Sequence, residues 1–64
     1  MNENNNRAAM TVQEFLDWAA IKKTTFYREV KEGRIRTRKV GRRTLVLIED
    51  ANRWLEGLPQ GGDL

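Results

Sequence analysis

The chain has 64 residues, a formal net charge of +3 and neither cysteine nor histidine. This length accommodates one small domain, and the missing residue types exclude disulfides, thiolate metal sites and the commonest general base of enzymes. No apolar stretch is long enough for a membrane span or the core of a signal peptide, so we expect a cytoplasmic protein stabilised by packing, without membrane contact.

The charge is unevenly distributed along the chain. Residues 22–43 contain ten basic and two acidic side chains, a net charge of +8, whereas the remaining residues have a net charge of −5. This segregation predicts one face that meets a polyanion and a neutral to acidic back. The alternative is a run of charge that is merely solvated.

The composition divides the chain into three parts. Residues 1–9 are polar, rich in asparagine and have nothing to bury, which predicts a disordered leader. Residues 10–58 form the expected domain. Residues 59–64 contain proline and glycine but no apolar pattern, which predicts a flexible tail.

The first predicted helix covers residues 12–20. Thr11 and Glu14 have the spacing of a capping box, in which each side chain accepts a hydrogen bond from the other's backbone N–H. The apolar stripe of this helix consists of Val12, Phe15, Leu16 and Ala19. Trp18 lies off the centre of that stripe, so we expect its side chain to be half-buried.

A second predicted helix covers residues 23–32 and follows the first after a tight turn. Phe26 and Val30 form its apolar side, and Gly33 is expected to end it in the left-handed conformation. The opposite side is expected to present Lys23, Thr24, Tyr27, Arg28 and Lys31. Two short helices joined in this way predict a helix-turn-helix.

After Gly33 the sequence changes to a period of two, which predicts a hairpin with strands over residues 35–40 and 44–48. The turn falls at residues 41–43, where glycine supplies an unusual backbone angle. Three arginines recur at every second position and are expected to line one side of the first strand: Arg34, Arg36 and Arg38.

A third helix is predicted over residues 50–56, with Asp50 as its cap. This helix would place Trp54, Leu55 and Leu58 against the core. Three helices and a hairpin in one short chain indicate the α+β class.

These residues offer little support for catalysis. The nearest approach to a paired-carboxylate site is Glu49 beside Asp50, and helix capping accounts for that pair. The sequence contains no phosphate-binding glycine loop and no metal-ligand spacing. We therefore expect a protein that is not an enzyme and uses neither a metal nor a cofactor.

The basic residues instead favour double-stranded DNA as the partner. A helix fits the major groove, and a hairpin tip with arginines suits an adjacent, narrow minor groove. The expected DNA-binding residues are Lys22, Lys23, Thr24, Thr25, Tyr27, Arg28 and Lys31 around the second helix, and Arg34, Arg36, Arg38, Lys39, Arg42 and Arg43 along the hairpin. Packing at the core rim is the alternative for Tyr27, and helix capping is the alternative for Thr24 and Thr25.

The order of these features resembles that of the excisionase-like DNA-binding domains, which are small winged helix-turn-helix proteins related to the MerR-type fold. The resemblance covers about residues 10–56 and is carried by MTVQEFLDWAAIKKTTFYREVKEGRI and KVGRRTLVLIEDANRWL. Its best-matched points are Gly33, residues 41–43 and Trp54 with Leu55. The resemblance implies that the second helix is a recognition helix and that the Gly41 hairpin is a wing.

The resemblance also implies a role. The family includes recombination directionality factors, which bind and bend attachment-site DNA, frequently as adjoining copies, and assist an integrase in excision. It also includes small transcription regulators and terminase small-subunit domains. We favour a directionality factor, because 64 residues leave no room for an effector-sensing domain. A transcription regulator is the runner-up, and a protein-interaction module that docks an acidic partner is a third alternative.

The chain departs from the family pattern in both helices of the helix-turn-helix. Lys22 stands where the family has a serine-like cap, so Thr24 is expected to cap the second helix instead, which would shorten it. Leu16 and Ala19 reverse the usual small and large residues of the first helix, as a volume-conserving exchange would.

A third departure concerns the strand TLVLI, which is apolar on both sides. A two-stranded hairpin packs one side on the core, so the other side should be wet unless something covers it. Leu45 and Leu47 are therefore candidate protein contacts, with a neighbouring copy on DNA or with an integrase. Coverage by Trp18, by the third helix or by a tail is the alternative.

Overall fold

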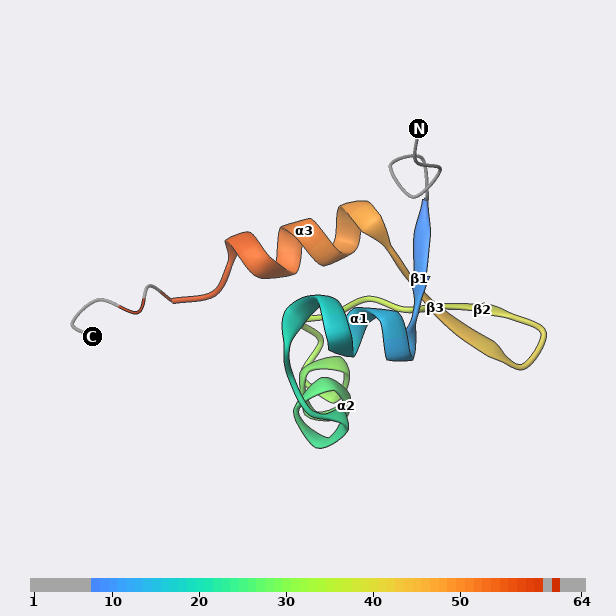
Figure 1. Ribbon diagram of the computed structural model, residues 1–64, viewed down its shortest axis with the longest axis horizontal. Coiled ribbons are helices and arrows are strands. Elements are labelled where there is room, and N and C mark those ends of the chain that lie inside the picture. The colour runs from blue at the N-terminus through green and yellow to red at the C-terminus, as the bar shows by residue number, and fades with distance from the viewer. Residues whose placement is uncertain (1–7, 60, 62–64) are drawn as a thin grey trace.

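A computed structural model describes residues 8–59 and 61. This part of the chain has an α+β architecture of three helices and one three-stranded antiparallel sheet (Figure 1). In chain order the elements are β1 (Ala9–Thr11), α1 (Val12–Ala19), α2 (Lys23–Lys31), β2 (Arg38–Val40), β3 (Arg43–Leu47) and α3 (Ile48–Glu56). The α+β class predicted from the sequence is confirmed.

The strand β1 lies partly where the sequence predicted a disordered leader. It pairs with β3, with Met10 opposite Val46, which gives the sheet order β1-β3-β2. Both of these side chains are buried, and the Ile48 N–H donates to the Ala8 carbonyl at 2.8 Å. The prediction was therefore wrong at its last two residues, because backbone pairing with a central strand orders a segment too short to show a period. The rest of the expected leader, residues 1–7, lies outside the described residues.

The helix α1 begins as its sequence predicts. The Thr11 hydroxyl accepts from the Glu14 N–H at 3.1 Å, and the Glu14 carboxylate accepts from the Thr11 N–H at 2.9 Å, so the capping box is complete. Ala20 ends the helix in the left-handed conformation, with φ +57°. This angle, unusual for a residue with a Cβ, turns the chain sharply from α1 toward α2.

The helix α2 starts without a side-chain cap. Lys22 is the N-cap residue, so the expectation that Thr24 caps and shortens the helix is wrong. Gly33 ends the helix region with φ +82°, as predicted. The Gly33 N–H donates to the Val30 carbonyl at 3.0 Å and the Arg34 N–H to the Glu29 carbonyl at 2.9 Å, which is the Schellman pattern.

The core lies between the helices and one face of the sheet, and aromatic rings form its centre. Phe15 is fully buried, and its ring centroid lies 5.4 Å from that of Phe26 and 5.3 Å from that of Trp54. Trp18 packs against the same ring at 5.5 Å and stays 44% exposed, as the half-buried prediction states. Contacts from α1, α2 and α3 therefore converge on one side chain, which fixes the three helices together.

The first predicted strand is shorter than expected. Residues 35–37 lie outside β2, and Ile35 is only 3% exposed because its side chain turns into the core. Arg34 and Arg36 therefore lie in the segment before the strand, and the prediction that they share a strand side with Arg38 is wrong. The alternating pattern therefore includes Ile35, whose buried side chain anchors a segment that is not part of the sheet.

The helix α3 follows β3 directly. It starts at Ile48 with Leu47 as the N-cap, so the prediction of a helix capped by Asp50 is wrong. Asp50 instead lies buried in the first turn. Trp54 packs in the core as predicted, whereas Leu55 and Leu58 are 48% and 39% exposed, which contradicts the expectation for them.

Two parts of the molecule project from the core, the helix α2 and the β2–β3 hairpin (Figure 1). In Figure 1, α1 lies between α2 and α3, and the β2–β3 hairpin extends away from all three helices.

None of the helices among residues 8–59 and 61 is long and apolar enough to cross a membrane.

Candidate nucleic-acid interface

One side of α2 is exposed and rich in polar and basic groups. Phe26 is fully buried on the other side, which orients the helix against the core. Of the residues expected to contact DNA around α2, Lys22, Lys23, Thr24, Tyr27, Arg28 and Lys31 are exposed, whereas Thr25 is partly buried. The ring centroids of Tyr27 and Phe26 lie 5.0 Å apart with the rings nearly perpendicular, and Tyr27 is 51% exposed, so it has both a packing contact and a free side.

The β2–β3 hairpin carries the second group of basic residues. Val40 pairs with Arg43, so the turn consists of Gly41 and Arg42. Gly41 has φ +60° with no atom within 4 Å of a Cβ built on it, which means that the backbone angle, and not crowding, calls for glycine. Arg42 therefore lies at the tip, and Arg43 is the first residue of β3 beside it.

The strand register divides the hairpin's side chains between two faces. Arg38 is opposite Leu45, and Lys39 is opposite Thr44, so Arg38 and Lys39 point to different sides of the sheet. All three residues of β2 are exposed. The hairpin thus offers a basic tip and basic groups on both sides near that tip.

Leu45 and Leu47 lie on the sheet face away from the core. Leu45 is opposite Thr11 and Leu47 is opposite Ala9, so β1 flanks them, and both leucines are partly buried. Val40 shares this face by register and is 61% exposed. The neighbour of these leucines in the sheet is β1, which was not among the expected covers. By register Arg38 and Arg43 also lie on this face, so its apolar part has basic side chains beside it.

Arg34 belongs to a network that joins three segments. Its guanidinium donates two hydrogen bonds to the Glu29 carboxylate, at 2.9 and 3.1 Å, and the Trp54 indole N–H donates to the same carboxylate at 3.0 Å. The Arg34 pair and the indole hydrogen bond lower the pKa of Glu29, and the carboxylate raises the pKa of Arg34. The charge of Arg34, expected to be available for phosphate, is paired with Glu29, so the two groups together carry no net charge.

Sequence alone contained a signal for this network. A helix that ends in a Schellman motif brings the residue after the left-handed glycine over the residue four positions before that glycine. Here these residues are Arg34 and Glu29, so a salt bridge takes the place of the usual apolar contact. The identity of the third partner, Trp54, depends on how α3 packs and had no such signal.

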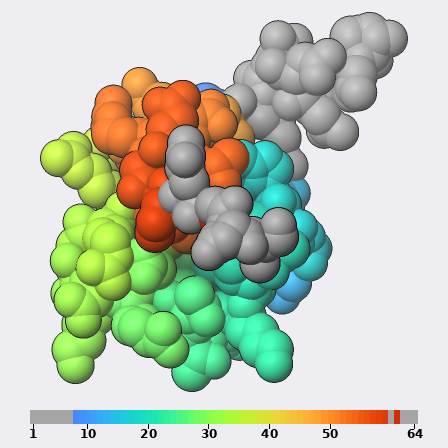
Figure 2. Space-filling model, turned by 90° about the vertical axis from the view of Figure 1, so that its left-hand side faces the viewer, coloured from blue at the N-terminus to red at the C-terminus, as the bar shows by residue number. Residues whose placement is uncertain are grey.

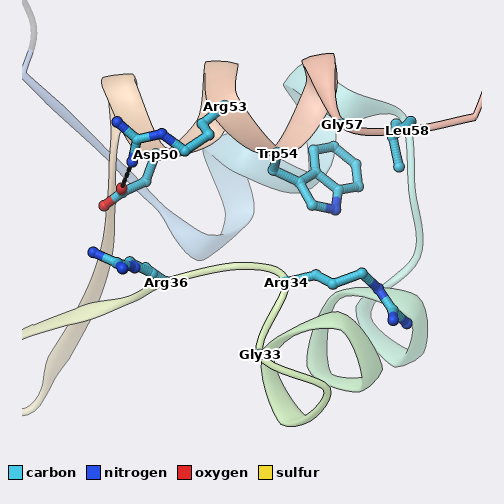
Figure 3. Close-up of a pocket in the computed structure, with 8 residues that line it drawn as sticks. All are labelled: Gly33, Arg34, Arg36, Asp50, Arg53, Trp54, Gly57 and Leu58. Atoms are coloured by element: carbon cyan, nitrogen blue, oxygen red, sulfur yellow. Dashed lines mark hydrogen bonds and ion pairs between the residues drawn. The ribbon is translucent and has the colours of Figure 1, made fainter.

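A cleft of about 310 Å³ lies between α3 and the segment that follows α2. Figure 2 shows this segment, in yellow-green, beside the orange α3. Arg34 lies at one end of the cleft, and Arg36, Asp50 and Arg53 gather toward the other (Figure 3). From the sequence, Arg53 had no predicted role and Asp50 only a capping role, although their spacing of three on a helix is that of an ion pair.

Comparison of the chain with protein-family models, curated proteins and solved structures gives no match. What the protein does therefore has to be inferred from its own residues.

Proposed function

We propose that this protein binds double-stranded DNA as a winged helix-turn-helix, with α2 as the recognition helix and the β2–β3 hairpin as the wing. The observation that carries the proposal is the placement of the basic residues. Of the eleven basic residues in the described part of the chain, four lie on or next to the exposed side of α2 and four lie on the exposed β2–β3 hairpin, and both elements pack on the same core (Figure 1). A surface with this charge attracts the phosphate backbone, and its two projections suit two grooves.

The side of α2 that would enter the major groove combines side chains able to read bases with side chains that meet phosphates. Thr24 and Arg28 lie four residues apart and are both exposed, so they point to the same side of the helix. Arginine forms paired hydrogen bonds with guanine, and threonine contacts bases through its hydroxyl or methyl group. Lys22, Lys23 and Lys31 lie around these residues as phosphate contacts.

The hairpin would place its tip in the neighbouring minor groove. A narrow minor groove has an enhanced negative potential that attracts arginine. Arg42 is at the tip and Arg43 follows it, while Arg38 and Lys39 lie nearer the core for contacts with the backbone. This contact would respond to groove shape more than to individual bases.

For the biological role, we propose a recombination directionality factor that bends attachment-site DNA and assists an integrase. The support is the resemblance to excisionase-like domains together with the apolar outer sheet face, which gives a bound copy a surface for a neighbour. Leu45, Leu47 and Val40 belong to that face. A transcription regulator would make the same contacts with DNA and is the second candidate.

Binding assays with two variants test the assignment of the two projections. We expect Arg28→Ala to reduce the preference for the selected site over random DNA, and the double change of Arg42 and Arg43 to alanine to weaken binding to both. Fluorescence anisotropy with a selected duplex and a random duplex measures both effects. If Arg28→Ala weakened both duplexes equally, α2 would not be the reader of sequence.

Footprinting on genomic DNA tests the role. Adjoining protected direct repeats and bent DNA are expected of a directionality factor. One protected palindrome without a bend is expected of a dimeric regulator, and this result would replace the proposed role while leaving DNA binding intact.

A further inference from the structure

Asp50 is the buried charged residue of the described chain. Its side chain is 6% exposed, and its Oδ1 accepts from the Arg53 guanidinium at 3.2 Å. Its Oδ2 is buried and has no hydrogen-bond partner among the described residues. A buried carboxylate oxygen without a donor costs free energy, so a nearby N–H group that can reach this oxygen would be stabilising.

Arg36 is placed to be that donor. In Figure 3 its guanidinium lies below the Asp50 carboxylate, on the opposite side from Arg53. It lines the same cleft and has no hydrogen-bond or ion-pair partner in the part of the chain that the structure describes. One carboxylate therefore lies between two guanidinium groups from different segments, and each of its oxygens can hold one of them.

We propose that Arg36 and Arg53, oriented by Asp50, form a second phosphate-binding pair that grips the DNA backbone beside the wing. This inference rests on the proposed function and adds Arg53 and Asp50 to it. A guanidinium that uses one edge for a carboxylate keeps other N–H groups free for a phosphate oxygen. The Arg53 side chain is 68% exposed, so these groups are accessible.

The third arginine of the cleft is not part of this pair. Arg34 gives two hydrogen bonds to Glu29, which is itself fixed by Trp54. Arg53 is paired with Asp50 and Arg36 has no partner among the described residues, so the three groups together keep a net positive charge of one. Phosphate is therefore the chemistry that suits this end of the cleft. One residue, Thr37, separates Arg36 from β2 of the hairpin.

The first test is a salt titration of duplex binding. It compares the wild type with a double variant that carries both Arg36→Ala and Arg53→Ala. Each phosphate contact contributes about 0.9 to the slope of log affinity against log salt, so we expect the slope to fall by about two. Asn52→Asp is a control that makes the chain more acidic on an exposed position of α3 outside the cleft. We expect this control to keep the wild-type slope.

The second test uses Asp50→Asn, which makes the protein more basic by one charge. If Asp50 only offset positive charge, the variant would bind DNA more tightly. As a positioning residue, it should instead weaken binding severalfold in spite of the added charge. Circular dichroism on the same samples checks folding, and Arg53→Lys, which keeps the charge but lacks the planar fork, should show a partial loss.

The outcomes separate the two proposals. If the wild type fails to bind DNA, the proposed function and this inference both fail. If the wild type binds, the wing variants weaken it, and the Arg36 and Arg53 double variant behaves like Asn52→Asp, only this inference is overturned. Tighter binding by Asp50→Asn would also overturn it.

Discussion

Residues 34–36 and residues 38–43 are both rich in basic side chains, yet their environments differ. In the first segment Ile35 is buried and Arg34 is paired with Glu29, so the segment is docked against α2 and α3. In the second, all of β2 is exposed and Val40 is 61% exposed. The difference teaches that a basic pattern acquires its role from the apolar anchors and carboxylates around it.

The largest expected effect of this difference is on stability. Ile35→Ala should lower the free energy of unfolding by about 3 kcal/mol, because it leaves a cavity in the core. Val40→Ala, an aliphatic truncation in the hairpin, should change it by less than about 0.5 kcal/mol. Urea unfolding measures both values. Similar losses for the two variants would mean that the segments are not differently anchored.

Substitution of glycine should have the same effect at Gly33, which precedes the first segment, and at Gly41, which lies in the second. Gly33 and Gly41 both have positive φ and open space around a built Cβ, so alanine at either position should cost about 1 kcal/mol of backbone strain without a clash. Thermal unfolding of the two variants measures this cost. A stabilised alanine variant would show that the position does not hold the left-handed angle.

The smallest expected effect is a dependence on pH that only the docked segment has. The pKa of Glu29 lies below its ordinary value of 4.5, since Arg34 and then Trp54 bond to its carboxylate. A lowered pKa stabilises the folded state above the ordinary value, and this contribution is lost as the pH falls through the lowered pKa. The melting temperature should therefore fall in this acid range.

The variant Glu29→Gln sharpens that measurement. The glutamine at position 29 cannot ionise, so the melting temperature of the variant should depend less on pH below 4.5 than that of the wild type. Equal acid dependence in both proteins would show that Arg34 is not held by a Glu29 carboxylate and would make the first segment resemble the second.

Local spacing made part of the fold predictable. The capping box of Thr11 and Glu14 and the left-handed glycines at 33 and 41 need only neighbouring residues, and these predictions are confirmed. The strand β1 was missed because three residues show no period and their order comes from pairing with β3. The start of α3 was misplaced because β3 leads into it without a turn.

In the candidate site, too, some features were predictable from local spacing and others depend on how distant segments pack. The exposed side of α2 follows from helix geometry once Phe26 faces the core, so its residues were found from the sequence. The salt bridge between Glu29 and Arg34 also has a local signal, because the helix ending at Gly33 brings these two residues together. The gathering of Arg36 with Asp50 depends on how α3 packs over a distant segment, which no local pattern states.

The central claim is that the arginines of the hairpin tip meet DNA with unpaired charge, whereas Arg34, which is paired with Glu29, does not. The most direct measurement is the salt dependence of duplex binding for two variants, the double change of Arg42 and Arg43 to alanine and the single change Arg34→Ala. We expect the first to reduce the slope of log affinity against log salt by about two and the second to leave it unchanged. A slope that falls with Arg34→Ala and stays constant with the hairpin variant would contradict the account.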